Sequence, residues 1–185
     1  MAEETGNSAP PTAPGADLAE VARLAGRRGP PPVHLWDPPF CGDMDLVILP
    51  DGRWIHDGRP IARPEMVRLF ASILKREGDR YFLVTPVEKL GIRVEDAPFL
   101  AVDADIGPDA ITLTTNVGDV VTAGPDHPIR VEDRDGAPRP YVHVRRGLDA
   151  LIDRKTFYRL VEAAEPGPDG GLVLRSDGAV FPLGA

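Results

Sequence analysis

Two stretches of the sequence present the same features in the same order, and this repeat constrains the fold more than anything else in the chain. Each stretch predicts a strand, an Asp-Gly turn, a return strand that ends on an aromatic residue, an aliphatic residue and a histidine, and then a helix. The turns fall at residues 51–52 and 135–136, and the return strands end at His56 and His143. A hairpin cannot bury both of its faces alone, so we expect each hairpin to pack on its own helix and the two units to pack together.

The helix of each unit starts beside an arginine, Arg63 in the first unit and Arg154 in the second. A guanidinium group can bind a carboxylate or a phosphate with two hydrogen bonds, so both arginines are candidate anchors for an acidic ligand. The alternative is a structural tie between hairpin and helix. The recurrence favours this alternative, because a residue that the fold requires recurs in every copy. Asp153 is the expected N-cap of the second helix.

The segment between the two units predicts mostly strands, because Leu90, Ile92 and Val94 alternate with small or charged residues. The 21 prolines and 19 glycines of the chain argue against a helical bundle. We therefore expect an α+β protein in which two related hairpin-plus-helix lobes are arranged around a mainly antiparallel β region.

Three regions follow from these patterns. Residues 1–33 are expected to form a disordered tail with a short helix and a proline-rich linker. Residues 34–80 are the expected first lobe. Residues 81–185 are the expected second lobe, which holds the central β region, the second hairpin-helix unit and a terminal hairpin.

Charge and composition exclude several classes of protein. The formal net charge is −8, so the chain as a whole repels a nucleic-acid backbone or an anionic membrane. A local basic patch remains possible, and the cluster that stands out is formed by Arg139, Arg145 and Arg146. A single cysteine, Cys41, excludes an intramolecular disulfide, and the first residues lack the basic start and apolar run of a secretory signal. We therefore expect a soluble cytoplasmic protein that binds neither nucleic acid nor membrane.

Motifs of the common catalytic and metal-binding chemistries are absent from the sequence. It contains no phosphate-binding loop, no dinucleotide-binding glycine motif and no Gly-x-Ser-x-Gly elbow. The histidines are not spaced as metal ligands on a helix, and the acidic segment 103–109 departs from a calcium loop at its key positions. We expect no metal and no cofactor, and we assign no catalytic residue.

The unrepeated segment of residues 85–96 is the candidate binding region, since a ligand site usually occurs once whereas scaffold residues recur. Thr85 and Glu88 have the spacing of a capping box that would start a helical turn, which leaves Lys89 and Arg93 unexplained. Alternatively, these residues line a groove between the lobes that favours an anion. The candidate ligand-binding residues are Thr85, Glu88, Lys89, Arg93, Asp96, Trp54 and Arg63.

Four strings of the sequence carry a resemblance to a known family. They are GDMDL at residues 42–46, DGRWIHDGRPIAR at 51–63, YFLVTPVEK at 81–89 and VEDAPF at 94–99. Through them the chain resembles a bacterial domain-of-unknown-function family, number 1285 in its series, over residues 36–165. The resemblance implies a two-part fold with repeated motifs and a suggested role in signal transduction, and it supplies no catalytic residues.

Three hypotheses for function remain at this point. The leading one is a non-enzymatic module that binds a small anionic ligand or a protein partner and acts in regulation. The first alternative is a small hydrolase or transferase that uses His56 with a carboxylate, Glu88 or Asp96. The second is a protein-interaction adaptor, which would expose an apolar patch of several hundred Å² instead of a concave pocket.

Overall fold

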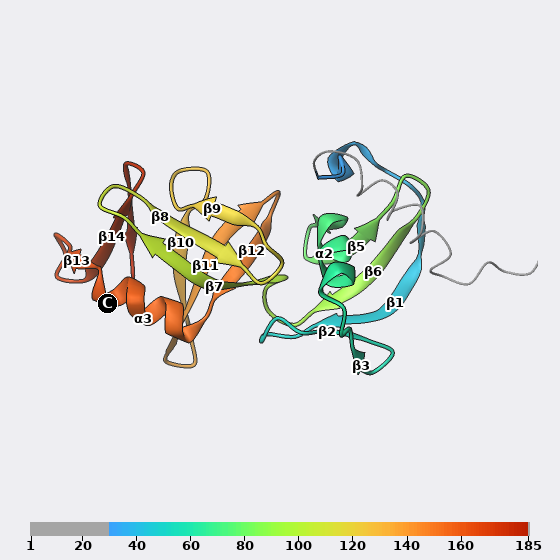
Figure 1. Cartoon of the computed structure of the whole chain (residues 1–185), viewed down its shortest axis with the longest axis horizontal. Helices are drawn as coiled ribbons and strands as arrows, with labels where there is room; N and C mark the ends of the chain where they lie inside the picture. Colours follow the sequence, from blue (N-terminus) through green and yellow to red (C-terminus); the bar gives the residue numbers. More distant parts are fainter. Residues whose placement is uncertain (1–29, 185) are drawn as a thin grey trace, which may run out of the picture.

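The strands of the first lobe form one six-stranded sheet. The computed structural model describes residues 30–184, and Figure 1 shows the two lobes side by side along its long axis. In chain order the strands are β1 (Phe40–Ile48), β2 (Trp54–His56), β3 (Arg59–Pro60), β4 (Leu74–Glu77), β5 (Arg80–Val84) and β6 (Lys89–Val94). Their order in the sheet is β3-β2-β1-β6-β5-β4. Helix α2 (Pro64–Ser72) connects β3 to β4, and a short 3-10 helix, η1 (Val33–Leu35), precedes β1.

The second lobe holds another six-stranded sheet and a small third sheet. The strands of the large sheet are β7 (Phe99–Ile106), β8 (Ile111–Thr115), β9 (Val120–Thr122), β10 (Ile129–Arg134), β11 (Ala137–Arg145) and β12 (Leu148–Ile152). Their order is β10-β11-β12-β7-β8-β9. Helix α3 (Arg154–Glu162) follows, and the third sheet contains β13 (Glu165–Pro166), β14 (Leu172–Ser176) and β15 (Ala179–Pro182).

The two large sheets have the same topology. In each, the first and last strands pair in parallel at the centre, β1 with β6 and β7 with β12, and the other neighbours pair antiparallel. Strands β1 to β6 therefore correspond one by one to β7 to β12. This correspondence confirms a repeated two-part fold. The structure is mostly β within residues 30–184, so the α+β class expected from the sequence fits only loosely.

The sequence-based alignment of the repeat is wrong, however. The turn at residues 51–52 joins the first strand of its sheet to the second, whereas the turn at 135–136 joins the fourth to the fifth. The helices are not equivalent either, because α2 follows the third strand and α3 follows the sixth. An Asp-Gly pair marks a tight turn without identifying which hairpin of a sheet it closes, and this is the physical reason for the error.

The expected lobe boundary also needs correction. We expected the first lobe to end at residue 80, but β5 pairs with β4 and β6 pairs with β1, so the first sheet extends to Val94. Residues 95–98 then connect the two large sheets. The predicted tail falls outside the described residues except for 30–33. No helix in the described part of the chain is long and apolar enough to cross a membrane.

Most local turn signals in the sequence are confirmed by the backbone. Asp135 and Gly136 both have positive φ, as a two-residue hairpin turn requires, and so do the Asp-Gly pairs at 57–58 and 177–178. The two-residue turn expected at 51–52 is wrong, because only Gly52 has a positive φ there and residues 49–53 separate β1 from β2. The carboxylate of Asp153 accepts a hydrogen bond of 2.7 Å from the backbone N–H of Thr156, so Asp153 is the N-cap of α3.

A continuous apolar core runs through both lobes. In the first lobe, Phe70 of α2 stacks on Trp54 of β2 with 6.3 Å between ring centroids, and both side chains are buried. In the second lobe, Phe157 and Leu160 of α3 are buried in the same cluster as Phe99 of β7. Because burying an apolar side chain of this size contributes roughly 1.5–3 kcal/mol, these contacts fix each helix on its sheet.

Polar contacts fasten one lobe to the other. The side-chain oxygen of Asn116 accepts a hydrogen bond of 3.0 Å from the backbone N–H of Leu100, and its NH₂ group donates one of 3.2 Å to the carbonyl of Gly52. The Nη2 group of Arg145 donates to the carbonyl of Ala71, the penultimate residue of α2, at 2.9 Å. A side chain of the second lobe therefore satisfies backbone groups of the first in both cases.

Replacing Asn116 with alanine tests whether its hydrogen bonds at the junction of the lobes stabilise the protein. Asn116→Ala leaves the carbonyl of Gly52 and the N–H of Leu100 without these partners, so we expect the free energy of unfolding to fall by about 1–3 kcal/mol. Urea unfolding followed by circular dichroism measures the change. Arg68→Ala, an exposed substitution on α2, is the control and should change stability little; equal effects of both substitutions would contradict the interlobe role of Asn116.

Candidate ligand-binding pocket between the lobes

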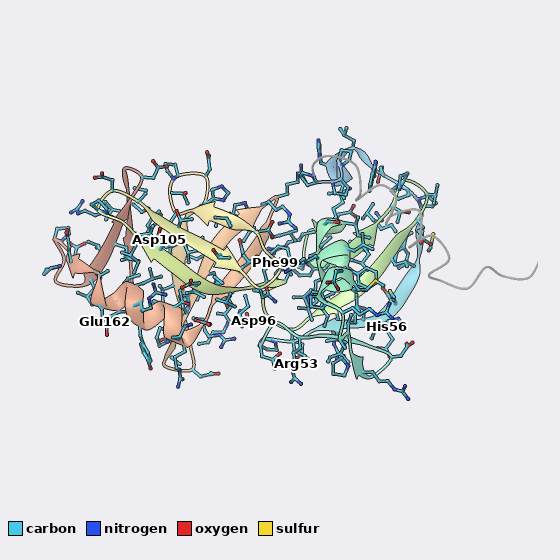
Figure 2. All side chains as sticks on the ribbon, viewed as in Figure 1. Arg53, His56, Asp96, Phe99, Asp105 and Glu162 are labelled. Atoms are coloured by element: carbon cyan, nitrogen blue, oxygen red, sulfur yellow. The ribbon has the colours of Figure 1, made fainter. Side chains whose placement is uncertain are left out.

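A polar pocket of about 210 Å³ lies where the two large sheets meet. The first sheet contributes residues of β4 and β5, the second sheet contributes residues of β10, β11 and β12, and the connector 95–98 completes the wall. Its charged and aromatic lining residues are Arg76, Tyr81, Asp96, Arg130, Glu132, Arg134, Tyr141 and Asp149. Figure 2 shows Asp96 at this junction.

Two arginine–tyrosine pairs face this pocket, one from each lobe. Arg76 of β4 lies opposite Tyr81 of β5, and Arg130 of β10 lies opposite Tyr141 of β11. The guanidinium carbon is 5.6 Å from the ring centroid in the first pair and 4.7 Å in the second, within the range of cation–π contacts. Because β4 and β5 correspond to β10 and β11, corresponding hairpins of the two sheets each contribute an arginine–tyrosine pair to one pocket, although the two pairs lie at different distances from their turns.

Asp96 anchors the connector to the second sheet. Its side chain is only 2% exposed, and its carboxylate accepts hydrogen bonds from Tyr141 at 2.6 Å, from Arg134 at 3.1 Å and from Arg139. A buried carboxylate is tolerated when it is paired with cations and hydrogen-bonded, and both conditions hold here. Its oxygens are therefore occupied by protein groups, which makes Asp96 a part of the pocket wall.

A chain of charged groups continues from the pocket along the second sheet. Arg130 Nη1 lies 3.0 Å from Asp149 Oδ2, and Arg130 Nε donates to Glu132 at 3.1 Å. Burial acts to lower the pKa of Arg130, but the Asp149 and Glu132 carboxylates more than offset it, so the pKa is raised. The other oxygen of Asp149 contacts His143 Nδ1 at 3.0 Å, and the ring of His143 stacks on that of His127.

The two tyrosines of the pocket are protonated at neutral pH. Burial raises the pKa of Tyr81 above its ordinary value, while Arg76 opposes this shift. Burial also raises the pKa of Tyr141, which in addition donates its hydroxyl proton to Asp96. Both phenols are therefore hydrogen-bond donors. Within residues 30–184 the Tyr81 hydroxyl has no hydrogen-bond partner, so this donor is available to a ligand.

Most of the site residues expected from the sequence lie elsewhere. Trp54 is only 1% exposed, belongs to the core and does not line the pocket. Lys89 pairs with Glu77 at 2.9 Å, and Arg93 is exposed with its nearest carboxylate, Glu95, at 3.6 Å. Arg63 is exposed at the start of α2 and makes no side-chain cap.

Thr85 and Glu88 form a local turn outside the pocket. The hydroxyl of Thr85 accepts hydrogen bonds from the backbone N–H groups of Val87 at 3.3 Å and Glu88 at 3.1 Å, as a cap does. No helix follows, because β6 begins at Lys89, so the expected helical turn is wrong. Of the seven residues expected from the sequence, only Asp96 lines the pocket between the lobes.

His56 and Asp96, one of the two pairs proposed for hydrolysis, are not brought together. The Nδ1 atom of His56 lies 3.7 Å from the neighbouring Asp57, and its side chain is 40% exposed on the first lobe. Asp96 instead contacts arginines of the second lobe, and Figure 2 shows His56 away from the junction where Asp96 lies.

The sequence did not reveal the arginine–tyrosine pairs, because the two pairs do not share one spacing along the chain. In both sheets the arginine precedes the tyrosine across one hairpin turn, but the two hairpins differ in length. The signal that could have found them is an arginine and a tyrosine flanking a glycine-containing turn at positions that pair across it.

Comparisons with known proteins agree with these features, which define a protein of two related domains with one large sheet in each. Residues 31–97 match the family described as "Domain of unknown function (DUF1285), N-terminal domain", and residues 98–183 match "Protein of unknown function (DUF1285), C-terminal domain". The chain therefore belongs to the DUF1285 family, which confirms the resemblance in its sequence. The domain boundary between Ala97 and Pro98 falls within the pocket wall.

Two solved structures are similar to the chain. A DUF1285 family protein from Silicibacter pomeroyi is 56% identical and superposes with a TM-score of 0.83 over 90% of this chain and 93% of that one. One from Shewanella baltica is 31% identical, with a TM-score of 0.52 over 63% of this chain and 90% of that one. No curated protein matches the chain.

Replacing Asp96 tests its role as an anchor. Asp96→Asn removes the negative charge that Arg134 and Arg139 share, so we expect a loss of about 1–3 kcal/mol of stability in urea unfolding. Asp105→Asn, on an exposed position of β7, is the matched control and should have little effect. A wild-type stability for Asp96→Asn would contradict the anchoring role.

The raised pKa values of Tyr81 and Tyr141 predict a dependence on alkaline pH. Because each folded-state pKa is above the ordinary value of 10.0, the neutral phenols favour the folded protein below that pH, and this contribution is lost as the pH rises through the folded-state values. The midpoint temperature of thermal unfolding should fall less steeply with increasing pH, above about pH 10, in Tyr81→Phe and Tyr141→Phe than in wild type. The exposed Tyr158→Phe should follow the wild-type curve more closely, and identical curves for all four proteins would contradict the prediction.

Proposed function

We propose that the protein is a non-enzymatic ligand-binding module with a regulatory role, and that its ligand occupies the pocket between the lobes. One observation carries the proposal: two arginine–tyrosine pairs, carried by corresponding hairpins of the two lobes, face a single pocket. Arginine–tyrosine pairs with a purely structural role would contact only their own sheets. The two pairs here instead line one shared pocket, as in a binding site formed by two related halves.

The hydrogen-bonding groups of the pocket favour a ligand rich in acceptors. Asp96, Glu132 and Asp149 already accept hydrogen bonds or ion pairs from arginines. The Tyr81 hydroxyl remains as a donor beside the guanidinium groups. A small anion, such as a carboxylate, supplies the acceptors that these donors need. A pocket of about 210 Å³ is smaller than the roughly 300–1,000 Å³ of drug-sized sites, which suits a small metabolite.

The protonation states in the pocket support binding in preference to catalysis. A general base works best when its pKa is near the operating pH and when its lone pair can reach the substrate. The carboxylates of this pocket are paired with arginines, and the pKa values of both phenols are raised away from neutrality. These groups can orient a ligand but are poorly suited to abstract a proton from it.

An adaptor role has less support from the surface. The large apolar side chains that are exposed within residues 30–184 come from both lobes and from the third sheet. They are Leu35, Phe40, Val87, Val120, Tyr158, Leu172 and Val180.

A regulatory role would follow from the position of the pocket. A ligand that contacts Tyr81 and Arg130 restrains both lobes at once, and the connector 95–98 forms part of the wall, so binding would favour one relative placement of the lobes. A signalling protein can use such a change as its output. The single cysteine and the acidic character of the chain fit a cytoplasmic setting for this role.

A ligand search with matched tyrosine variants tests the proposal. Native mass spectrometry of the purified full chain should reveal a bound small anion, and thermal-shift screening of small carboxylates should identify ligands that raise the melting temperature. Tyr81→Phe removes the free donor and should weaken the binding of ligands that occupy this pocket by about tenfold in calorimetry. Tyr158→Phe should leave the affinity unchanged.

Two further variants distinguish this pocket from the groove that we expected from the sequence. Lys89→Ala and Arg93→Ala should not alter the affinity, since neither residue lines the pocket. Ligands whose affinity depends on Lys89 or Arg93, and not on Tyr81, would move the site to that groove and contradict the assignment to the pocket.

A further inference from the structure

A second cavity between the lobes differs in chemistry from the first. It has a volume of about 180 Å³ and lies among η1, β4 and the turn between β11 and β12. Its charged lining residues are all basic: Lys75, Arg76, Arg145 and Arg146. The remaining wall is largely apolar and includes the buried side chains of Leu74 and Leu148.

Three of the four cations already have partners in the protein. Lys75 contacts Glu77 at 3.1 Å, and Arg145 contacts Asp119 at 2.5 Å. Arg76 donates to the backbone carbonyl of Gly147 at 3.1 Å. These three side chains are therefore parts of the scaffold.

Arg146 differs from the other three cations. Its side chain is exposed, and within residues 30–184 it has no hydrogen bond or ion pair. An arginine at the edge of a cavity that lacks carboxylates carries a positive charge that no carboxylate of the described residues neutralises. A guanidinium group in this position can bind a carboxylate through two parallel hydrogen bonds.

The backbone at Arg146 makes this arginine unusual. Arg146 has φ +46° and Gly147 has φ +75°, so the two residues form a hairpin turn with positive φ at both central positions. The other three non-glycine residues with positive φ in the described chain are aspartates, which tolerate this conformation better than arginine does. Residues held in an unfavourable backbone conformation occur preferentially at functional sites.

We propose that this cavity is a second binding site, which takes a small organic acid with a carboxylate on Arg146 and an apolar portion against Leu74 and Leu148. At about 30 Å³ for each water-sized group, the cavity has room for roughly six such groups. A short branched carboxylate of the size of isovalerate fits both the volume and the chemistry. The site is independent of the Arg–Tyr pocket, although Arg76 borders both cavities.

Titration of the full-length protein with isovalerate, followed by calorimetry, tests the proposal. Isovalerate should bind, whereas its neutral amide should bind at least tenfold more weakly because it lacks the charge that Arg146 recognises. Inorganic phosphate, which has no apolar portion, should also bind more weakly. Phosphate binding as tight as that of isovalerate would overturn the assignment of an apolar ligand portion, and no detectable isovalerate binding would overturn the site.

Arg146→Asn separates binding from folding. Asparagine is preferred at this turn position, so the variant should unfold at a temperature about 2–4 °C above wild type while its affinity for isovalerate falls at least tenfold. Arg146→Lys should retain part of the affinity. An affinity unchanged in Arg146→Asn, or a lower melting temperature together with weaker binding, would overturn the proposal.

Two controls assign the effect to this cavity. Asp135→Asn makes a similar change in the turn between β10 and β11 and should leave isovalerate binding unchanged. Tyr81→Phe alters the other pocket and should also leave it unchanged. A loss of isovalerate binding in Tyr81→Phe equal to that in Arg146→Asn would show that the acid occupies the Arg–Tyr pocket, which would overturn the second site.

Discussion

The buried carboxylate of Asp96 is the interaction on which the arrangement of the lobes depends. It lies in the four-residue connector 95–98 and is held by Tyr141, Arg134 and Arg139 of the second sheet. A charge removed from water must be compensated by partners at fixed positions. The connector therefore cannot shift relative to the second sheet without leaving a charge unpaired.

The junction between the lobes also brings residues of both halves of the repeat into one pocket. Each sheet places an arginine opposite a tyrosine at equivalent strands, and the junction turns both pairs toward the same pocket. The result is a site with donors from two related halves, although neither domain alone contains the whole of it. A division of the chain at residue 97 would separate Arg76 and Tyr81 from Arg130 and Tyr141.

The two cavities between the lobes differ in the charge and polarity of their lining residues. In the Arg–Tyr pocket, arginines are balanced by carboxylates and the free donor is a phenol. In the second cavity, the charged lining is entirely basic, and Arg146 has no hydrogen bond or ion pair within the described part of the chain. Arg76 borders both, and its bond to the carbonyl of Gly147 joins the first lobe to the turn that carries Arg146. A ligand in one cavity therefore lies next to a side chain that shapes the other.

Local sequence determined the turns and the helix cap, because these depend on residues close together in the chain. The Asp-Gly pairs at 57–58, 135–136 and 177–178 specify positive φ, and Asp153 caps the helix that follows it. The sequence also carried the strings that place the chain in its family. Tertiary structure alone decided the parallel pairings of β1 with β6 and β7 with β12, the true correspondence of the two halves, and the placement of Tyr81 and Arg130 in one pocket. The reason is that strand register and lobe docking are set by contacts between residues far apart in the chain, and no local spacing records them.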